Sequence, residues 1–499
     1  MDTLIIDGGP LTPDQVVSVA HRKARAVPSP DLAERLAPAR EVVERAVDSG
    51  EIVYGITTGF GALANTNIGR SETEALQVNL VRSHATGVGD SLPDEVVRAM
   101  LLLRARTLAQ GHSGVRPQVV GKLLEMLERD ILPAVPSQGS VGASGDLAPF
   151  AHLALPVIGE GMVKLEGRVV PTSESGLEPI RLGTKEGLSL LNGTEGMTAM
   201  GVLALDRCRK LVRAADIACA LTVEALMGSA RPFDPRVHEL RPHPGQAASA
   251  ERIRRLIEGS EIGESHADDF DHAVQDAYSL RCAPQVHGAV SDTLDHVESV
   301  LRRELSAVVD NPIVFPETGE VISAGNFHGQ PLAFALDFMA IAASELGSIS
   351  ERRTDRILDP ARSNGLPAFL APDPGVNSGY MIAQYTQAAL VAENRVLSHP
   401  ASVDSVPTSG MQEDHVSMGW GAGRKLWPVM DNVRRVIAVE ILCAVQGIEH
   451  RKPLRPASGT GAVVERVRSV VPPLTGDRVL SGEIEAVARM IETGELIDL

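Results

Sequence analysis

Long runs of regularly spaced apolar residues in the second half of the chain limit the fold more than any other feature. Apolar side chains recur every three, four or seven residues in 205–226, 290–308 and 332–349. Two further helical stretches are predicted near 380–397 and 432–448. Helices of about 20 residues span roughly 30 Å. The pattern therefore predicts a mainly α protein built around a bundle of long helices with near-parallel axes.

The first 200 residues have a different pattern. Short helical patches alternate there with glycine-rich loops at 54–61, 83–89 and 137–146. Such loops carry function when a rigid scaffold holds them. The chain is therefore predicted to divide into a loop-rich part, residues 1–200, and a part formed by the long-helix bundle and the C-terminal helices, residues 201–499.

Strands are expected to be few. No alternating pattern of strands and helices is visible in the sequence, which argues against a doubly wound sheet. One hairpin is predicted, with strands at 313–315 and 320–323 on either side of the turn Glu317-Thr318-Gly319.

Composition excludes several classes of protein. Lys plus Arg is 47 and Asp plus Glu is 64, which gives a net charge of −17. Nucleic-acid binders and anionic-membrane binders carry a basic face, so we expect neither partner. The N-terminus has no basic region of a secretory signal, and the most apolar long stretch, 331–350, is interrupted by Asp337 and Glu345. We expect a cytoplasmic metabolic enzyme.

The segment Gly142-Ala143-Ser144-Gly145 has two interpretations. A row of small residues is typical of a tight turn or a phosphate-binding loop, although the Gly-Lys-Ser/Thr ending of a Walker loop is absent. The alternative is autocatalytic cyclisation, in which the Gly145 nitrogen attacks the Ala143 carbonyl and Ser144 loses its hydroxyl as water. The product is a methylidene-imidazolone ring (MIO), a strong electrophile. Glycine at the third position lets the backbone fold back without a Cβ clash.

The chain has only four tyrosines, and two of them are in positions that suggest chemistry. Tyr54 lies among glycines, where an aromatic side chain has little core to fill. Tyr278 precedes Arg281 by three residues. A phenol can act as a general base, and the guanidinium fork suits a substrate carboxylate. The alternative for this pair is a helix-surface tyrosine beside a structural arginine.

Three further polar residues each have a functional and a structural interpretation. Asn192 begins an Asn-Gly pair, which is also the strongest turn dipeptide. His84 is one of 14 histidines, and a single histidine is more often structural than catalytic. Glu413 opens Glu413-Asp414-His415, which alone resembles a helix cap.

No metal is assigned from the sequence. His238 and His243 lack metalloprotease spacing, and the four cysteines match no zinc module. A polar segment resembles a metal cluster, but a solvated loop explains it better; its residues are His266, Asp268, Asp269, Asp271 and His272.

Eight segments together resemble the aromatic amino-acid lyase family, with the best match to its histidine-specific members. The resemblance runs from about residue 50 to 450, and the segments occur in the family order. They are YGITTGFG, NLVRSHATGVG, GSVGASGDLAP, LLNGT, QDAYSLRCAPQVHG, DNPIVF, GNFHGQP and HPASVDSVPTSGMQEDHVSM.

The resemblance implies a helical fold of the aspartase/fumarase type, a homotetramer, and active sites shared between subunits. It also implies that Ala143, Ser144 and Gly145 form the MIO group. Tyr54 is implied as the base that takes the β-proton, and Arg281 as the carboxylate anchor. The residues implied to line the electrophile and the substrate amine are Asn192, Gln275, Tyr278 and Phe327.

The same resemblance implies the substrate. Ser83-His84 is similar to the pair of the histidine enzymes, whereas tyrosine enzymes have His-Leu and phenylalanine enzymes Phe-Leu. Glu413 is the polar partner expected for an imidazole. The implied reaction is elimination of ammonia from L-histidine to give trans-urocanate, the first step of histidine degradation. Departures from the family pattern at Glu195, Gly410-Met411 and Gln330 bear on kinetics rather than on reaction class.

Alternatives remain at this point. A tyrosine or phenylalanine ammonia-lyase and an aminomutase belong to the same chemical class. A non-catalytic helical scaffold descended from such an enzyme is the rival from another class, although its expected loss of Ser144 or Tyr54 is not seen. A fumarase-type lyase needs a GSSxMPxKxN loop, which is absent.

Overall fold

The computed structural model describes residues 2–58, 73–267 and 274–497, and its chain forms two compact units. Unit 1 comprises Met1–Leu203, Glu298–Leu336 and Pro400–Arg424, and unit 2 comprises Ala204–Val297, Asp337–His399 and Lys425–Leu499. Four long helices contain residues of both units; these are α8, α13, α14 and α16. The sequence predicts that the chain divides at residue 200 into two parts, and this division stays a prediction.

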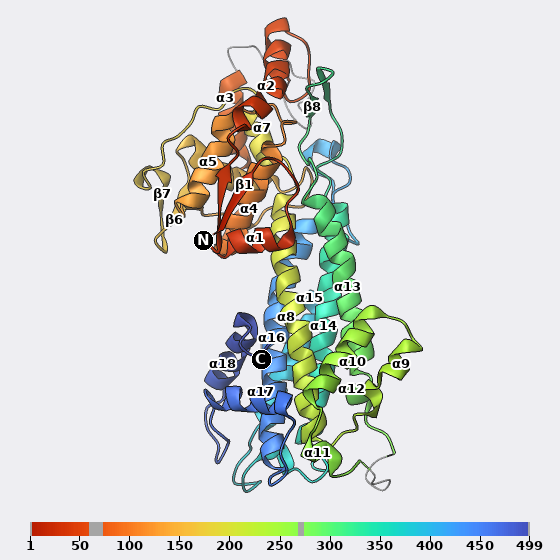
Figure 1. The fold of residues 1–499 in the computed structure, drawn as a ribbon. Coiled ribbons are helices and arrows are strands. Elements are labelled where there is room, and N and C mark those ends of the chain that lie inside the picture. The colour runs from red at the N-terminus through yellow and green to blue at the C-terminus, as the bar shows by residue number, and fades with distance from the viewer. Residues whose placement is uncertain (1, 59–72, 268–273, 498–499) are drawn as a thin grey trace. The chain divides into compact units, whose positions relative to one another are not determined.

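The long helices of the bundle form where apolar spacing predicts them. In Figure 1 they run side by side, and small residues allow close contact: a Cβ on Gly447 would lie 3.0 Å from that of Ala225. The mainly α prediction is therefore confirmed. Each predicted stretch overlaps a helix, although α13 ends at Glu304, four residues before the end of the predicted stretch 290–308. The long helices are α8 (Glu195–Ala225), α13 (Ala283–Glu304), α14 (Gln330–Leu358), α15 (Met381–Leu397) and α16 (Gly419–Glu449).

Short helices complete unit 2 around the bundle. Helix α10 crosses α13 at two glycines, where a Cβ on Gly288 would overlap the backbone of Gln246. Only glycine permits this approach. The short helices are α9 (Pro235–Glu239), α10 (Pro244–Leu256), α11 (Glu261–Glu264), α12 (Tyr278–Arg281), α17 (Ser458–Arg468) and α18 (Ser481–Thr493).

The central helix of unit 1 is α4 (Asp94–Leu108), which packs against α1 and α5 and in which every residue from Val96 to Leu108 is buried. Its helix α1 begins with a capping box between Thr12 and Gln15, which satisfies two backbone amides. The other helices are α1 (Pro13–Ala20), α2 (Leu32–Ser49), α3 (Thr73–His84), α5 (Pro117–Glu128), α6 (Leu147–Ala154) and α7 (Glu186–Leu191).

The strands of unit 1 form small pairs and one three-stranded sheet. Antiparallel β8 (Ile313–Phe315) and β9 (Glu320–Ile322) confirm the predicted hairpin. One parallel pair departs from the sequence analysis: β1 (Asp2–Ile6) and β2 (Ala24–Pro28) enclose α1 as a small β-α-β unit. The remaining strands are β3 (Val88–Ser91), β4 (Leu132–Pro133), β5 (Pro136–Gln138), β6 (Met162–Leu165) and β7 (Arg168–Pro171).

Among the described residues, α14 is the one helix long and apolar enough to cross a membrane. Two thirds of its most apolar window, 67%, is buried inside the protein. Asp337 within it lies 2.5 Å from the Lys425 ammonium group. These contacts are those of a core helix.

Candidate active site

The site residues proposed from the sequence occur in both units. Unit 2 holds Gln275, Tyr278 and Arg281. Unit 1 holds the others, which are Tyr54, His84, Ala143, Ser144, Gly145, Asn192, Phe327 and Glu413.

The Ala143-Ser144-Gly145 tripeptide forms a turn directly before α6, and the turn after α7 holds it in place. The Gly193 amide donates to the Ser144 carbonyl oxygen at 3.2 Å, and the Asp146 amide donates to the Gly193 carbonyl oxygen at 2.8 Å. These two bonds form a short parallel bridge. Neither bond involves the Gly145 nitrogen, which is the atom expected to attack during cyclisation.

Gly145 is the position where the backbone requires glycine. Its φ of +76° is unfavourable for other residues, and a Cβ there would overlap the Gly193 carbonyl oxygen. Asp146 follows it and is fully buried; its Oδ2 accepts from the Met197 amide at 2.8 Å. Burial raises the pKa of Asp146 to about 8, so the carboxyl group next to the tripeptide is mostly protonated at neutral pH.

A distant segment covers the other end of the turn. The Met418 amide donates to the Val141 carbonyl oxygen at 2.9 Å, and the Ser417 hydroxyl donates to the Gly142 carbonyl oxygen at 3.3 Å. Ala143 and Ser144 stay half-buried, whereas Gly142 and Gly145 are buried. The turn is therefore fixed at both ends while its reactive residues keep some exposure.

Asn192 lies at the end of α7 with its side chain 3% exposed. Its Nδ2 donates to the Asn311 carbonyl oxygen at 2.8 Å. Its Oδ1 is buried and has no hydrogen-bond partner among the described residues. A buried amide oxygen without a partner is costly, and a donor on a bound molecule would remove that cost.

His84 ends α3 half-buried, and its ring is oriented by its own helix. Its Nδ1 lies 2.9 Å from the Leu80 carbonyl oxygen, which can only accept, so Nδ1 carries the proton. Burial lowers the pKa of His84, although the carboxylate of Glu413 opposes that shift. The neutral ring therefore leaves Nε2 as an acceptor.

Glu413 lies in a short turn after Pro407 and is near enough to His84 to influence its charge. Its Oε2 accepts from the Thr408 hydroxyl at 2.7 Å, and its carbonyl oxygen accepts from the Thr408 amide at 2.9 Å. The turn fixes the carboxylate in an irregular segment rather than at a helix start. The structural alternative of a cap therefore does not describe Glu413.

Tyr54 and Phe327 both lie in turns and are half-buried. Tyr54 is followed by Gly55, whose φ of +71° marks a left-handed turn. The neighbour of Phe327, His328, stacks on His415 with ring centroids 5.8 Å apart. This contact brings the segment with Phe327 beside the segment with Glu413.

The unit 2 residues are presented at the surface of the chain. Tyr278 is 71% exposed at the start of the four-residue helix α12, and Gln275 is also exposed. The Arg281 guanidinium packs over the Tyr278 ring at 4.5 Å from its centroid. The two side chains therefore pack against each other, as their spacing on one helix turn suggests.

A buried network of charged residues, which the sequence analysis missed, contacts the backbone of α12. Arg353 is fully buried and forms a double ion pair with Glu440, with Nη2 2.8 Å from Oε2. Its Nη1 donates to the Ser279 carbonyl oxygen at 3.4 Å and lies 3.3 Å from His287. In sequence, Arg353 reads as one of several charges near the end of a long helix, so only a long-range contact could identify it.

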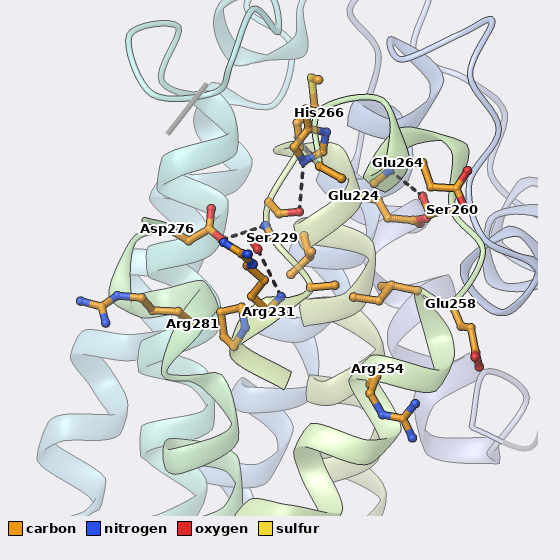
Figure 2. Close-up of a pocket in the computed structure, with 18 of the residues that line it drawn as sticks. Glu224, Ser229, Arg231, Arg254, Glu258, Ser260, Glu264, His266, Asp276 and Arg281 are labelled. Atoms are coloured by element: carbon orange, nitrogen blue, oxygen red, sulfur yellow. Dashed lines mark hydrogen bonds between the residues drawn. The ribbon is translucent and has the colours of Figure 1, made fainter. Parts of the chain in front are cut away.

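A cavity of about 1000 Å³ lies in unit 2 (Figure 2). Gln275 and Arg281 contribute to its wall, together with Glu224 and His266. Figure 2 shows the Arg281 guanidinium extending away from the other labelled side chains. Arg281, the residue expected from the sequence to bind the substrate carboxylate, therefore does not point toward the other labelled residues of this cavity.

The described residues contain no group of three His, Cys, Asp or Glu side chains that could hold a metal ion. His266 instead lies 3.3 Å from the Gly228 carbonyl oxygen. The other members of the polar segment lie outside the described residues; these are Asp268, Asp269, Asp271 and His272.

Comparison with known proteins identifies the family of this chain. The family model of the aromatic amino acid lyases matches residues 11–469 of the sequence. The chain belongs to the aromatic amino acid lyase family. This membership confirms the resemblance drawn from the eight sequence segments.

Relatives of this lyase match it over nearly their whole length. A histidine ammonia-lyase of Gloeobacter violaceus is 52% identical, and the match covers 100% of this chain and 97% of the relative. The crystal structure of a histidine ammonia-lyase from Trypanosoma cruzi has a TM-score of 0.91 and 43% identity, covering 100% and 94% of the two chains. The lyase fold is therefore shared throughout.

A family member with a different activity is also close in structure. The crystal structure of a tyrosine aminomutase from Streptomyces globisporus has a TM-score of 0.94 and 40% identity, covering 99% of this chain and 98% of the aminomutase. Fold similarity alone therefore does not separate a lyase that acts on histidine from an aminomutase. The side chains that read the substrate must make that distinction.

Proposed function

We propose that this chain eliminates ammonia from L-histidine to give trans-urocanate, the first step of histidine degradation. The observation that carries the substrate assignment is the 52% identity, over the whole chain, to a histidine ammonia-lyase. The arrangement of His84 and Glu413 supports the same assignment.

His84 and Glu413 are the proposed readers of the imidazole. Because Nδ1 of His84 is used by the Leu80 carbonyl, Nε2 is left to accept an N–H from the substrate ring. Glu413 provides a second polar group, held by Thr408. A phenyl ring would leave both groups desolvated and unpaired, which is how a polar site rejects an apolar analogue.

The electrophile is proposed to be an MIO group made from Ala143, Ser144 and Gly145. The residues fit such a ring, since the left-handed Gly145 has no room for a Cβ and Ser144 retains exposure. The group would supply an electrophile that makes the substrate nitrogen a better leaving group. The unpaired Oδ1 of Asn192 would then accept from a donor on the substrate or the ring.

The remaining residues position the substrate and move its proton. Tyr54 is proposed to remove the β-proton, and Arg281 to bind the carboxylate through its guanidinium fork. Gln275, Tyr278 and Phe327 would line the amine and the electrophile. Holding the substrate at two ends fixes the geometry in which the proton and the amine are lost.

The native assembly is proposed to be a cytoplasmic homotetramer with active sites shared between subunits. Bundle helices α14 and α15 expose large apolar side chains, among them Ile341, Ile382, Tyr385 and Val396. Exposed apolar groups on long helices are typical of an interface between subunits. The exposure of Tyr278 and Gln275 also supports a site completed by a second chain.

The test is a side-by-side measurement of kcat/KM for L-histidine, L-tyrosine and L-phenylalanine, without added nicotinamide, flavin or pyridoxal phosphate. We expect histidine to exceed both by about 10⁴-fold. Replacing Ser83-His84 by Phe-Leu should remove most histidine turnover. His112→Leu is the matched control, because His112 is also partly buried and contacts a backbone carbonyl, that of Val314.

Equal turnover of phenylalanine or tyrosine would disprove the substrate assignment. The aminomutase alternative has its own readout, since an aminomutase returns ammonia to the product. Accumulation of a β-amino acid instead of urocanate would favour that alternative.

A further inference from the structure

One buried arginine, Arg104 on α4, holds the turn that faces the tripeptide. Its Nη1 donates to the carbonyl oxygens of Ser189 at 3.1 Å and Asn192 at 3.0 Å. Its Nη2 donates to the carboxylate of Glu195, the first residue of α8. A single guanidinium therefore joins the end of α7 to the start of α8.

The same guanidinium also contacts the helix that follows the tripeptide. Its Cζ lies 4.7 Å from the centroid of the Phe150 ring, in the first turn of α6. It also fills the space beside Gly193, where a Cβ would overlap Nη2. Arg104 thus contacts the turn that contains Gly193 by hydrogen bonds, and it contacts the helix that follows Gly145 by stacking on Phe150.

Burying this charge requires partners, which Nη1 and Nη2 of Arg104 have. Arg104 is 0% exposed, and Glu195 is 5% exposed. A buried charge is tolerated only when it is paired and hydrogen-bonded. The carbonyl oxygens at the end of α7 could be satisfied by water or by a backbone amide. The use of two charged side chains, Arg104 and Glu195, indicates that this turn must be held in a fixed geometry.

We propose that Arg104, with Glu195, is a positioning residue for formation of the MIO ring. It holds the 192–194 turn against the tripeptide, so that the bridge to Ser144 and Asp146 keeps the Gly145 nitrogen near the Ala143 carbonyl carbon. This inference rests on the proposed function.

The ring-forming step is balanced within the chain. A bond forms between the Gly145 nitrogen and the Ala143 carbonyl carbon, and the carbonyl oxygen leaves as water with the amide protons of Ser144 and Gly145. The Ser144 hydroxyl then leaves as a second water with the Cα proton. No oxidant or other reactant is needed, so the step depends on how the backbone atoms are held together.

The test follows the intact mass of newly made protein over time. Arg104→Lys keeps the charge but cannot reach all three acceptors. We expect conversion to the mass two waters lighter to be at least about tenfold slower than in wild type, a change of about 1.4 kcal/mol in the barrier. Arg98→Lys is the matched control: Arg98 is a buried arginine of the same helix, but it pairs with Asp130.

A second pair of variants covers the case in which Arg104→Lys does not fold. Glu195→Gln keeps an acceptor for Nη2 and should mature like wild type, whereas Glu195→Leu removes the acceptor and should mature slowly. Masses are read on the folded fraction from gel filtration. Full, fast conversion in both Arg104→Lys and Glu195→Leu would overturn the positioning role. A wild type without the mass loss would instead overturn the proposed function.

Discussion

The two units hold their site residues in opposite ways. In unit 1 the tripeptide turn is fixed by the Gly193 bridge on one side and by Ser417 and Met418 on the other. In unit 2 the Tyr278 side chain is 71% exposed on a helix of four residues, although buried Arg353 supports the backbone beneath it.

The difference fits the tasks proposed for the two regions. Ring closure joins atoms of one backbone, and it needs those atoms held together before any substrate arrives. Binding a carboxylate and an amine needs side chains that present their polar ends to an incoming molecule. Enclosure serves the first task, and exposure on a rigid support serves the second.

The largest expected effect comes from removing the electrophile of unit 1. Ser144→Ala should lower the rate of urocanate formation by about 10³-fold or more, at least about 4 kcal/mol in the barrier. Its unfolding free energy should stay within about 1 kcal/mol of wild type, because Ser144 is only half-buried. Ser137→Ala in β5, directly before the same loop, is the control and should retain most activity. Comparable activity in both variants would contradict the role of unit 1 as the source of the electrophile.

Subunit mixing tests whether the exposed groups of unit 2 act in a shared site. Tyr54→Phe and Arg281→Ala should each be nearly inactive. After subunit exchange at equal amounts, about a quarter of the sites should contain both intact residues if different subunits supply them. The restored rate of urocanate formation measures that fraction.

The control mixture combines Arg281→Ala with Tyr278→Phe, two changes in the same short segment. Any one copy of that segment is then defective, so no activity should return. Exchange itself is checked by native mass spectrometry with one tagged chain. Exchanged Tyr54→Phe and Arg281→Ala chains that stay inactive would contradict the shared site.

The smallest expected effect is an opposite pH response of the two units. Burial raises the pKa of Asp146 to about 8, so its contribution to stability is lost as the pH rises toward and through 8. Burial lowers the pKa of His287 below 6.5, so stability there is lost as the pH falls below that value. Hydrogen exchange, corrected for intrinsic rates, should show weaker protection of α6 at pH 9 than at neutral pH. It should likewise show weaker protection of α13 at pH 5.5 than at neutral pH, and each change should be about tenfold or less.

Two conservative variants identify the groups responsible. Asp146→Asn should flatten the alkaline response of α6, and His287→Gln should flatten the acid response of α13. If the responses persist in these variants, other groups cause them.

The sequence predicts the amphipathic helices well because each buries one face, as α13 and α15 do. It does not predict α4, because that helix is buried on all sides and has no polar face to set a period. The parallel pair of β1 and β2 was also missed, since its strands have five residues each and their pairing leaves no local pattern.

The same limit applies to the candidate site. The tripeptide is recognisable because its three residues are adjacent and each residue type has a chemical reason. Ser417 contacts Gly142 across 275 residues of chain, and no local pattern records that contact. Arg104 could have been singled out as an arginine within the apolar run Val96–Leu108, but its partners become visible only in the folded chain.

The intact mass of an active preparation tests the central claim most directly. If unit 1 makes its own electrophile, wild-type protein that converts L-histidine to urocanate without added cofactor should weigh two waters less than its sequence. Ser144→Ala should show no such loss. An active wild-type preparation with the unmodified mass would contradict the account.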